Sequence, residues 1–276
     1  MTASLTLLED HQTVRVSSQW RLRPHVTWWP MVLGLGENIK PGWKPTEHVF
    51  ITVPSLSRKH IFQAHPFTIA SAAPQASDSQ AQFDLLIRAH DGFSKDLLQY
   101  SKSHKSTIIR YDGPYGSMEA LEMLQDSDVA VVVAGGSGIA VAYPLICALA
   151  AQSRAINYGN DLENGCKRKA EKKFCLIWIV HEQSHISWIE AQKLKELREH
   201  GVDVIVPPPT RDVGRPDVAW LVKDWVSSRF CASVSDGRIG VVCSGPDGMN
   251  RDVRNSCAAM TAQGRNVHVA VEKFGW

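Results

Sequence analysis

The sequence has almost no excess charge of either sign, because 30 lysines and arginines face 28 aspartates and glutamates in 276 residues. A net charge of +2 argues against a nucleic-acid-binding protein, which needs a strongly basic surface. The six cysteines lack the spacing of metal ligands or of a disulfide framework, which is typical of a reducing compartment. The first residues, MTASLTLLEDHQ, lack the features of a signal or transit peptide. By itself the chain is therefore expected to be cytosolic, and no metal site is expected.

Long apolar runs are also scarce. Only residues 129–153 run without a charge for long enough to cross a bilayer, which takes about 20 residues. A Gly-Gly-Ser-Gly turn at the centre of this stretch would break a spanning helix, and Val131, Val132 and Val133 before it favour a buried parallel strand. We therefore expect a soluble chain without a transmembrane segment.

The length predicts two domains, since one domain typically takes about 100–200 residues. We place the first domain at residues 1–120 and the second at 121–276. In the first, short β-branched or alternating segments are separated by Gly, Pro and polar clusters, which predicts an antiparallel six-stranded β-barrel with one helix at 94–103 and a polar loop at 75–82. The six predicted strands are 13–18, 26–33, 49–53, 67–71, 84–89 and 106–111.

In the second domain strands alternate with helices, which predicts an α/β fold with a parallel sheet covered on both faces. After the strand, tight turn and helix within 128–150, strands are predicted at 174–180, 202–206, 238–243 and 266–271, and helices at 188–200, 217–229 and 247–262. Residues 155–173, which include KRKAEKK, interrupt the alternation and are interpreted as a charged, solvated insertion. A nucleic-acid patch is the alternative for this segment.

A glycine-rich turn follows the most apolar strand. Gly135, Gly136 and Gly138 permit close backbone approach, and a helix that starts at 137–139 would aim free N–H groups at an anion. This pattern predicts a phosphate-binding turn. It is an incomplete dinucleotide fingerprint, because Val141 stands where a small third residue is usual and no acidic residue follows at the usual distance.

The segment His65-Pro66-Phe67-Thr68-Ile69-Ala70-Ser71 resembles the flavin motif of the ferric reductase and NADPH oxidase superfamily, whose fold is ferredoxin-reductase-like. The segments LIRA, DGFS and DGPYG follow in the same order as in fungal ferric reductases, and the resemblance covers nearly the whole chain. Without the resemblance, the motif would be an ordinary strand that begins at Pro66, with Phe67 and Ile69 in the core.

The resemblance implies an FAD site in the barrel. Phe67 and Thr68 would lie against the flavin ring, His65 would lie near the diphosphate, and Arg88 would pair with the diphosphate. The implied FAD contacts are His65, Pro66, Phe67, Thr68, Ile87, Arg88, Gly92, Phe93, Ser94, Gly113 and Gly116. Two alternatives remain open, since Arg88 also suits a solvated strand and 113–116 also suits a turn between domains.

The resemblance implies a nicotinamide dinucleotide site in the second domain. Its predicted contacts are Gly135, Gly136, Ser137, Gly138, Ile139, His181, Cys243, Ser244, Gly245, Pro246 and Met249. The segment CSGPDGM resembles a Cys-Gly-Pro motif whose cysteine lies near the nicotinamide. Here Ser244 takes the position before Gly-Pro, and for Cys243 the favoured interpretation is a small buried strand residue.

The position at which relatives carry an arginine for the NADPH 2′-phosphate holds His181, followed by Glu182. A neutral histidine is a weaker phosphate partner, a glutamate repels phosphate, and a plain surface histidine is the alternative. At the C-terminus, Phe274 is the candidate for an aromatic ring that covers the flavin, ahead of Trp276, with an interface plug as the alternative. Thr68, Ser244 and Phe274 are the residues expected nearest to the reacting atoms.

The activity implied by the resemblance is hydride transfer from NADPH to FAD, with NADH not excluded. Electrons would then reduce ferric chelates, and in complete family members they would pass through haems of a membrane domain whose cytoplasmic side carries this part of the protein. This chain lacks the transmembrane histidine pairs for haem. A rival hypothesis is the dehydrogenase half of a superoxide-producing NADPH oxidase, and another is a non-catalytic remnant that serves as a binding module.

Overall fold

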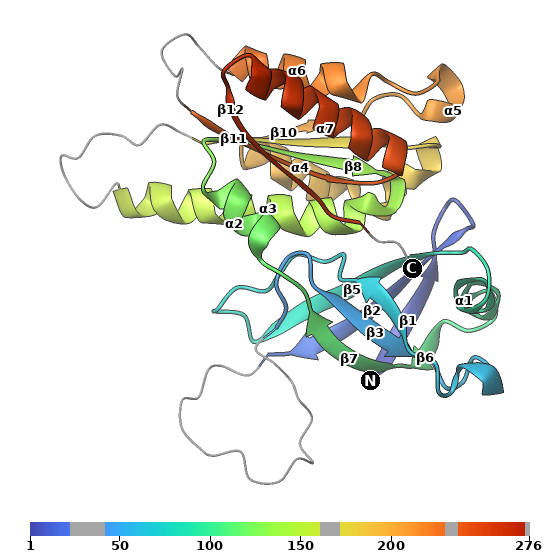
Figure 1. Cartoon of the computed structure of the whole chain (residues 1–276). Helices are drawn as coiled ribbons and strands as arrows, with labels where there is room; N and C mark the ends of the chain where they lie inside the picture. Colours follow the sequence, from blue (N-terminus) through green and yellow to red (C-terminus); the bar gives the residue numbers. More distant parts are fainter. Residues whose placement is uncertain (23–41, 161–171, 230–236, 274–276) are drawn as a thin grey trace. The chain divides into compact units, whose positions relative to one another are not determined.

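The computed structural model describes residues 1–22, 42–160, 172–229 and 237–273, without the side chains of 154–160. The chain divides into two compact units (Figure 1). Unit 1 contains Met1–Leu7 and Gln12–Gly116, and unit 2 contains Leu8–His11 and Ser117–Trp276. The assignment of Leu8–His11 to unit 2 is not indicated by the sequence. In unit 2, Asp10 of this short segment accepts a hydrogen bond from the Trp188 indole at 3.2 Å.

Unit 1 is built of antiparallel strands, as predicted. One sheet has the order β5-β2-β1-β6 and the other the order β4-β3-β7. The elements are β1 (Thr2–Leu7), β2 (Thr13–Arg21), β3 (His48–Thr52), the 3₁₀ turn η1 (Arg58–His60), β4 (His65–Thr68), β5 (Gln80–Arg88), α1 (Phe93–Ser101), β6 (Ser106–Ile108) and β7 (Arg110–Tyr115).

The strands of unit 1 differ from the prediction in several places. The strand Thr2–Leu7 is not indicated by the sequence, and the predicted strand 26–33 lies outside the described residues. The predicted strand 106–111 is divided at the buried Ile109, because β6 pairs with β1 whereas β7 pairs with β3. The predicted polar loop 75–82 ends early, since β5 begins at Gln80 and stays paired with β2 as far as Arg21.

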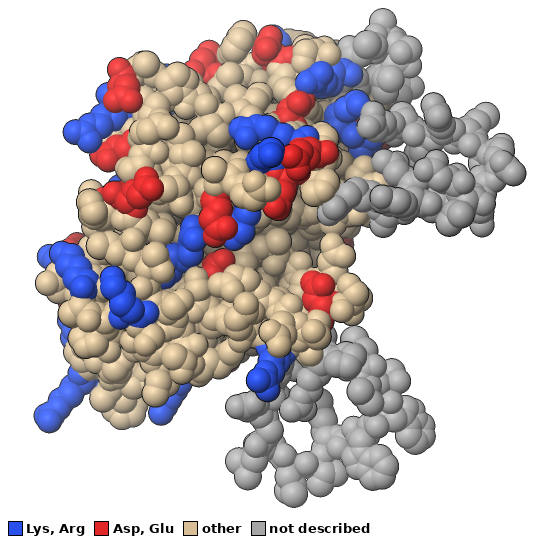
Figure 2. All heavy atoms as spheres, turned by 180° about the vertical axis from the view of Figure 1, so that it is seen from behind, with Lys and Arg blue, Asp and Glu red and all other residues tan. Residues whose placement is uncertain are grey.

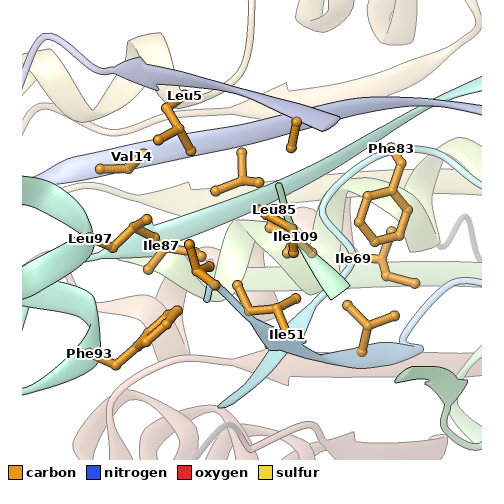
Figure 3. Packing of buried hydrophobic residues seen from close by; sticks show 14 of the residues in the cluster. Leu5, Val14, Ile51, Ile69, Phe83, Leu85, Ile87, Phe93, Leu97 and Ile109 are labelled. Atoms are coloured by element: carbon orange, nitrogen blue, oxygen red, sulfur yellow. The ribbon is translucent and has the colours of Figure 1, made fainter. Parts of the chain in front are cut away.

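The core of unit 1 is formed by buried side chains of these strands and of α1 (Figure 3). Alternate residues of β2 point inward, among them Val14, Val16 and Trp20, as expected of a strand with one buried face. Trp20 stacks on Phe83 with ring centroids 4.6 Å apart. Phe93 and Leu97 of α1 close one side of the same cluster.

Unit 2 is an α/β domain, as predicted, with a parallel sheet in the order β10-β9-β8-β11-β12. Its elements are α2 (Glu119–Gln125), β8 (Val129–Gly135), the 3₁₀ turn η2 (Gly136–Gly138), α3 (Ile139–Asn160), β9 (Lys173–Ile179), η3 (Gln183–Trp188), α4 (Ala191–Glu199), β10 (Val202–Ile205), α5 (Thr210–Val213), α6 (Val218–Arg229), β11 (Arg238–Ser244), α7 (Asp247–Ala262) and β12 (Asn266–Val271).

The central strand β8 is buried on both faces from Val129 to Ala134, which explains its unbroken apolar sequence. Helix α3 continues to Asn160, so the predicted insertion 155–173 begins within this helix and partly lies outside the described residues. One stretch of the described residues, Gly136–Ser153, is apolar and long enough to span a membrane, but 61% of it is buried inside the protein. It therefore has the burial expected of a core helix.

Candidate functional site

The predicted flavin motif forms β4, which pairs with β3 in antiparallel register. The His65 ring stacks on Phe93 with centroids 4.1 Å apart and planes at 21°, and Phe67 lies 5.9 Å from Phe93. Thr68 is buried. The structure thus brings together residues of two separate sequence motifs, HPFT and DGFS, on one side of unit 1.

The Nε2 atom of His65 is buried and finds no hydrogen-bond partner within the described part of the chain. Burial, followed by the nearby His60 ring, lowers the pKa of His65, so the ring is neutral at pH 7. A neutral imidazole with an unused nitrogen can still donate one hydrogen bond to, or accept one from, a bound ligand.

Helix α1 begins at Phe93, one of the two stacked residues. Gly92, at its N-cap, has φ = 63°, and no atom lies within 4 Å of the place where a Cβ would stand. The Ser94 hydroxyl accepts a hydrogen bond from the backbone N–H of His90 at 3.0 Å and so holds the preceding loop. The first N–H groups of a helix have no partner within it, so this end of α1 can bind an anion.

Other predicted residues of unit 1 have clear structural roles. Arg88, at the end of β5, is partly exposed, and its guanidinium lies 3.5 Å from the Gln12 side chain. The Ile87 side chain belongs to the core, so only its backbone could contact a ligand. A Cβ at Gly113 would lie 3.1 Å from the His48 carbonyl oxygen, and one at Gly116 would lie 3.0 Å from the Glu47 Cα. These glycines therefore let the end of β7 pack closely on its neighbours.

Sequence reasoning missed His60, which is 2% exposed and lies behind the stack. Its Nδ1 bonds to Gln63 and its Nε2 to Asp96, both at 2.9 Å, while its ring meets Phe93 edge-on at 5.4 Å. Because Asp96 lies in the first turn of α1, His60 ties η1 to this helix. Asp96 is 36 residues away from His60, so no local sequence pattern indicates this contact.

In unit 2 the predicted site residues lie where the strand order reverses. The chain runs outward from β8 to β9 and β10, and then continues on the other side of β8 with β11 and β12. Ligands of parallel sheets bind beyond the carboxyl ends of the strands at such a switch point. The turn after β8 and the segment after β11 both leave this edge, so the structure brings the predicted residues 135–139 and 244–249 together.

Glycines allow these two segments to interlock. A Cβ at Gly138 would overlap the Ser244 carbonyl oxygen and lie 2.7 Å from its carbon. A Cβ at Gly135 would lie 2.7 Å from Pro246, and one at Gly245 would lie 2.9 Å from the Cα of Gly135. Gly136 differs, because its φ is +55° and no atom lies within 4 Å of a Cβ there. The turn is therefore crowded on its inner side and open at Gly136.

Side chains around the turn are buried. Ser244 is 2% exposed, while Cys243 is fully buried in the core of unit 2 and points its thiol at the Ala270 carbonyl. Burial raises the pKa of Cys243 to about 12, so the thiol is neutral. This placement matches a small buried strand residue, and only the Cys243 backbone could approach a ligand. Met249 packs on the same core.

Two further residues that the sequence did not indicate hold the turn after β8 and the segment after β11. The indole of Trp178 in β9 donates a hydrogen bond to the Gly136 carbonyl at 3.1 Å. The Asn250 amide donates one to the Gly245 carbonyl at 2.7 Å, and its Oδ1 is buried without a partner in the described residues. Both side chains are almost fully buried. Neither residue belongs to a recognised motif in the sequence, so only their contacts reveal them.

His181 and Glu182 follow β9 at the same edge, next to a segment that comes later in the chain. His181 Nδ1 lies 3.0 Å from the Thr210 hydroxyl, and the Arg211 guanidinium donates to Glu182 at 2.9 Å. The sequence indicated neither Thr210 nor Arg211.

Beyond β12, Lys273 pairs with Asp247 at 2.8 Å and lowers the pKa of that carboxyl. The predicted residues Phe274 and Trp276 lie outside the described residues.

The residues present suit FAD in unit 1 and a dinucleotide in unit 2. Gly92 and Gly136 are open turns at helix starts, and His65 and Asn250 keep a buried polar atom unused among the described residues. In the same described residues no group of three or more His, Cys, Asp or Glu could hold a metal ion. On the face drawn in Figure 2, basic and acidic side chains of the described residues are interspersed over much of the surface.

Family models match both parts of the chain. Residues 36–119 match the FAD-binding domain model, and residues 127–206 match the ferric reductase NAD binding domain. Together they cover more than half of the chain, and each falls mainly within one structural unit.

Two curated relatives are similar to parts of this chain. Ferric reduction oxidase 2 of Arabidopsis thaliana is 30% identical over 189 residues, which is 67% of this chain and 23% of that protein. Probable metalloreductase AIM14 of Debaryomyces hansenii is 33% identical over 104 residues, which is 37% of this chain and 18% of that protein. The chain thus spans less than a quarter of the length of these relatives.

Solved structures share the fold. A flavohemoglobin from Malassezia yamatoensis, determined with FAD and heme, has a TM-score of 0.60 at 15% identity. The match covers 99% of this chain and 60% of the flavohemoglobin chain. A ferredoxin NADP+ reductase from Neisseria gonorrhoeae, with bound FAD and NADP, has a TM-score of 0.59 at 12% identity over 98% of both chains. At such low identity these neighbours confirm the ferredoxin-reductase-like fold alone.

Proposed function

Since this chain belongs to the ferric reductase family of proteins with paired FAD-binding and NAD-binding domains, we propose that it transfers a hydride from NADPH to FAD. Unit 1 would hold the FAD and unit 2 the nicotinamide dinucleotide. The observation that carries the proposal is the interlocked pair of segments after β8 and β11, at the switch point of the parallel sheet. Such a crevice is where open α/β sheets bind dinucleotides.

In unit 2, the turn after β8 would bind the diphosphate. Its N–H groups at the start of α3 favour an anion, and the open side of Gly136 admits one without a steric clash. The crowded inner side, where Gly138 lies against Ser244, fixes the distance between the two segments. Ser244 would then lie beside the nicotinamide, as its position before Gly-Pro suggests.

In unit 1, β4 and α1 would bind the FAD. The N-terminal end of α1 and the side chain of Arg88 would face the diphosphate, because both supply donors for a negative group. His65 would offer its unused Nε2, held by the stack on Phe93. The Thr68 hydroxyl would donate to the flavin near N5. Phe274 stays a proposal for the covering aromatic and lies outside the described residues.

The chemistry requires little acid or base catalysis from the protein. A bound flavin supplies the exchange between two-electron and one-electron transfer. The side chains would orient the two rings and exclude water from between them, because rate depends on bringing the nicotinamide C4 close to the flavin N5. The neutral Cys243 thiol has no charge to contribute to this step.

The electron acceptor is proposed from the relatives. A ferric reduction oxidase and a probable metalloreductase suggest ferric chelates as the final acceptor. Because the chain spans less than a quarter of these proteins, a haem-bearing membrane domain is proposed as the immediate partner, with this part of the protein on the cytoplasmic side.

The test is anaerobic reduction of the purified chain. After FAD is supplied, unbound flavin is removed, and the absorbance of the bound flavin is followed as NADPH or NADH is added. Rapid bleaching by NADPH is expected, with a soluble ferric chelate restoring the absorbance. A chain that retains no FAD would contradict the enzyme hypothesis and leave the remnant hypothesis.

A substitution refines this test. Thr68→Val keeps the shape of a residue that is only 8% exposed but removes its hydroxyl. We expect FAD to stay bound while reduction by NADPH slows by about tenfold or more, as when one preorganised donor is removed from a reacting centre. Ser71→Ala, which alters another buried hydroxyl whose oxygen accepts from the Asp84 N–H, is the control for a general effect on folding. Equal slowing in both variants would contradict the role of Thr68.

A further inference from the structure

We propose that one end of unit 1 binds the surface of an anionic lipid bilayer, with Phe62 as the side chain that enters the headgroup layer. Two segments form this end, the η1 segment (residues 54–64) and the β6 segment (residues 102–110), and we call them together the basic end. The inference concerns neither cofactor. It rests on the proposed function only in that a membrane partner is expected for this part of the protein.

Strand pairing and one side-chain bond bring the two segments together. β3 ends at Thr52, which pairs with Arg110 at the start of β7. The η1 segment leaves the sheet just after Thr52 and the β6 segment leads to Arg110, so both lie at this end of the strands. The hydroxyl groups of Ser55 and Thr107 are 2.6 Å apart and join the two segments directly. In Figure 1 the light-blue turn η1 projects from this end of unit 1, next to β6.

Both segments carry basic side chains and no acidic ones. Exposed lysines and arginines stand at five positions, Arg58, Lys59, Lys102, Lys105 and Arg110. Neither segment contains an aspartate or a glutamate, although the whole chain has a net charge of only +2. Nearby, Asp96 of α1 is already bound to Lys59 at 2.6 Å and to His60 at 2.9 Å, so it offsets only part of this charge. The basic end is therefore suited to an anionic surface.

Apolar side chains project from the same end. Phe62 is 94% exposed, the largest value among the exposed large hydrophobic residues of the described chain, and Ile108 is 64% exposed. A single exposed hydrophobic residue is ordinary. An almost fully exposed aromatic ring beside several cations is instead the pattern of segments that lie in a membrane interface, where the ring enters the boundary layer and the cations contact anionic headgroups.

A lipid surface suits this arrangement better than an acidic protein does. A protein partner must supply a pocket that matches Phe62, whereas a fluid layer of headgroups opens around a projecting ring. The attraction between charges extends over about 8 Å at physiological ionic strength, so the five cations can act together on a charged surface without individual partners. Binding of this kind holds the basic end against the cytoplasmic leaflet, which carries the anionic lipids.

The experiment measures how the full chain, supplied with FAD, sediments with lipid vesicles. The probes are vesicles of phosphatidylcholine alone and vesicles in which about a quarter of the lipid is phosphatidylserine. We expect binding to the anionic vesicles to be stronger by about tenfold or more, because each cation near the surface adds to the attraction. Raising the salt from about 0.1 M to about 0.5 M should weaken this binding, because the Debye length falls.

Three variants separate the charge from the ring. Lys102→Ala combined with Lys105→Ala is expected to lose about fivefold in affinity for each lysine removed. Phe62→Ser is expected to lose about tenfold or more, whereas Phe62→Trp should keep the affinity or raise it, because tryptophan favours the membrane interface. These side chains are exposed, so the melting temperatures of all three variants should match that of the parent protein.

The matched controls lie in unit 2. Trp220→Ser removes another exposed aromatic ring, which is 57% exposed on α6. Lys195→Ala combined with Arg251→Ala removes two cations whose side chains are 66% and 74% exposed. We expect both controls to bind the anionic vesicles like the parent protein. Losses as large as those of the basic-end variants would overturn the proposal.

The remaining outcomes also decide the question. Equal binding to the two kinds of vesicle, no binding to either, or a Phe62→Ser variant that binds like the parent protein would each overturn the inference. Binding to soluble polyglutamate that depends on Lys102 and Lys105, without binding to vesicles, would assign the basic end to an acidic protein and overturn the lipid proposal. If the chain binds anionic vesicles as expected but NADPH does not reduce its flavin, the proposed function fails and the inference stands; reduced flavin without vesicle binding gives the opposite result.

Discussion

Replacing Gly138 by alanine tests the close approach on which the unit 2 site depends. The new Cβ would overlap the Ser244 carbonyl oxygen, which is backbone and cannot rotate away. One of the two interlocked segments must shift, and overpacking of this kind costs about 1–3 kcal/mol. For a unit of this size, each kcal/mol lowers the melting temperature by about 2–4 °C, so a decrease of about 2–12 °C is expected.

The control is Gly248→Ala, in the first turn of α7. No atom lies within 4 Å of a Cβ at Gly248, and an alanine inside a helix is more stable than glycine by about 0.5–1 kcal/mol. The two substitutions add the same methyl group, one in each of the two segments that follow β8 and β11, and should shift stability in opposite directions. The difference between the stabilities of the two variants separates the steric effect at Gly138 from the loss of backbone freedom that any glycine replacement brings.

The assay is scanning calorimetry of the full chain, with NADP+ used to identify the unit 2 transition by its upward shift. Isothermal titration with NADP+ should show a loss of about tenfold or more in Gly138→Ala, equivalent to about 1.4 kcal/mol of binding energy. If Gly138→Ala melts within about 1 °C of the parent protein and binds NADP+ equally well, the segments do not need this contact and the reasoning is wrong.

Three other predictions concern single side chains. Phe93→Ala should cost about 3–5 kcal/mol and also weaken FAD binding in fluorescence titrations, whereas Leu97→Ala, equally buried in α1, should destabilise unit 1 with less effect on FAD; equal affinities would contradict the role of the stack. Because burial raises the pKa of Cys243 to about 12, native protein at pH 8 should alkylate this thiol far more slowly than unfolded protein, and its contribution to stability should be lost as the pH rises toward that value; equal rates would be inconsistent with burial. Because burial and His60 lower the pKa of His65, its contribution is present above the ordinary value of about 6.5 and is lost as the pH falls through the lowered pKa. His65→Gln should therefore unfold with a weaker acid dependence, and an unchanged dependence would show that other groups control it.

The sequence was sufficient for features that depend on neighbours along the chain. The unbroken apolar run of β8 predicts a central parallel strand because a strand buried on both faces cannot alternate. The alternation of strands and helices predicts the parallel sheet, and the antiparallel character of unit 1 follows from its short, turn-separated strands. The resemblance carried by His65–Thr68 then supplies the FAD and nicotinamide domains, which the family models confirm.

Sequence patterns failed where the partner is distant in the chain. The split between β6 and β7 depends on which strand each half meets, and β1, one of those partners, escaped detection. His60 meets Asp96 across 36 residues, and Arg211 meets Glu182 across 29. Local periodicity contains no signal for either contact, because the positions of the partners follow from strand pairing and helix packing.

The sequence by itself determined which residues each unit presents at its candidate site. These are the glycines of the turn after β8 in unit 2 and the His-Pro-Phe-Thr strand in unit 1. The tertiary structure decided how these pieces are held. It placed Gly138 against Ser244 and bonded Trp178 to the turn after β8 and Asn250 to the segment after β11. It also buried the Cys243 thiol and brought Arg211 to the end of β9. A glycine shows only that the backbone is free, whereas the packing of two distant segments shows what that freedom is used for.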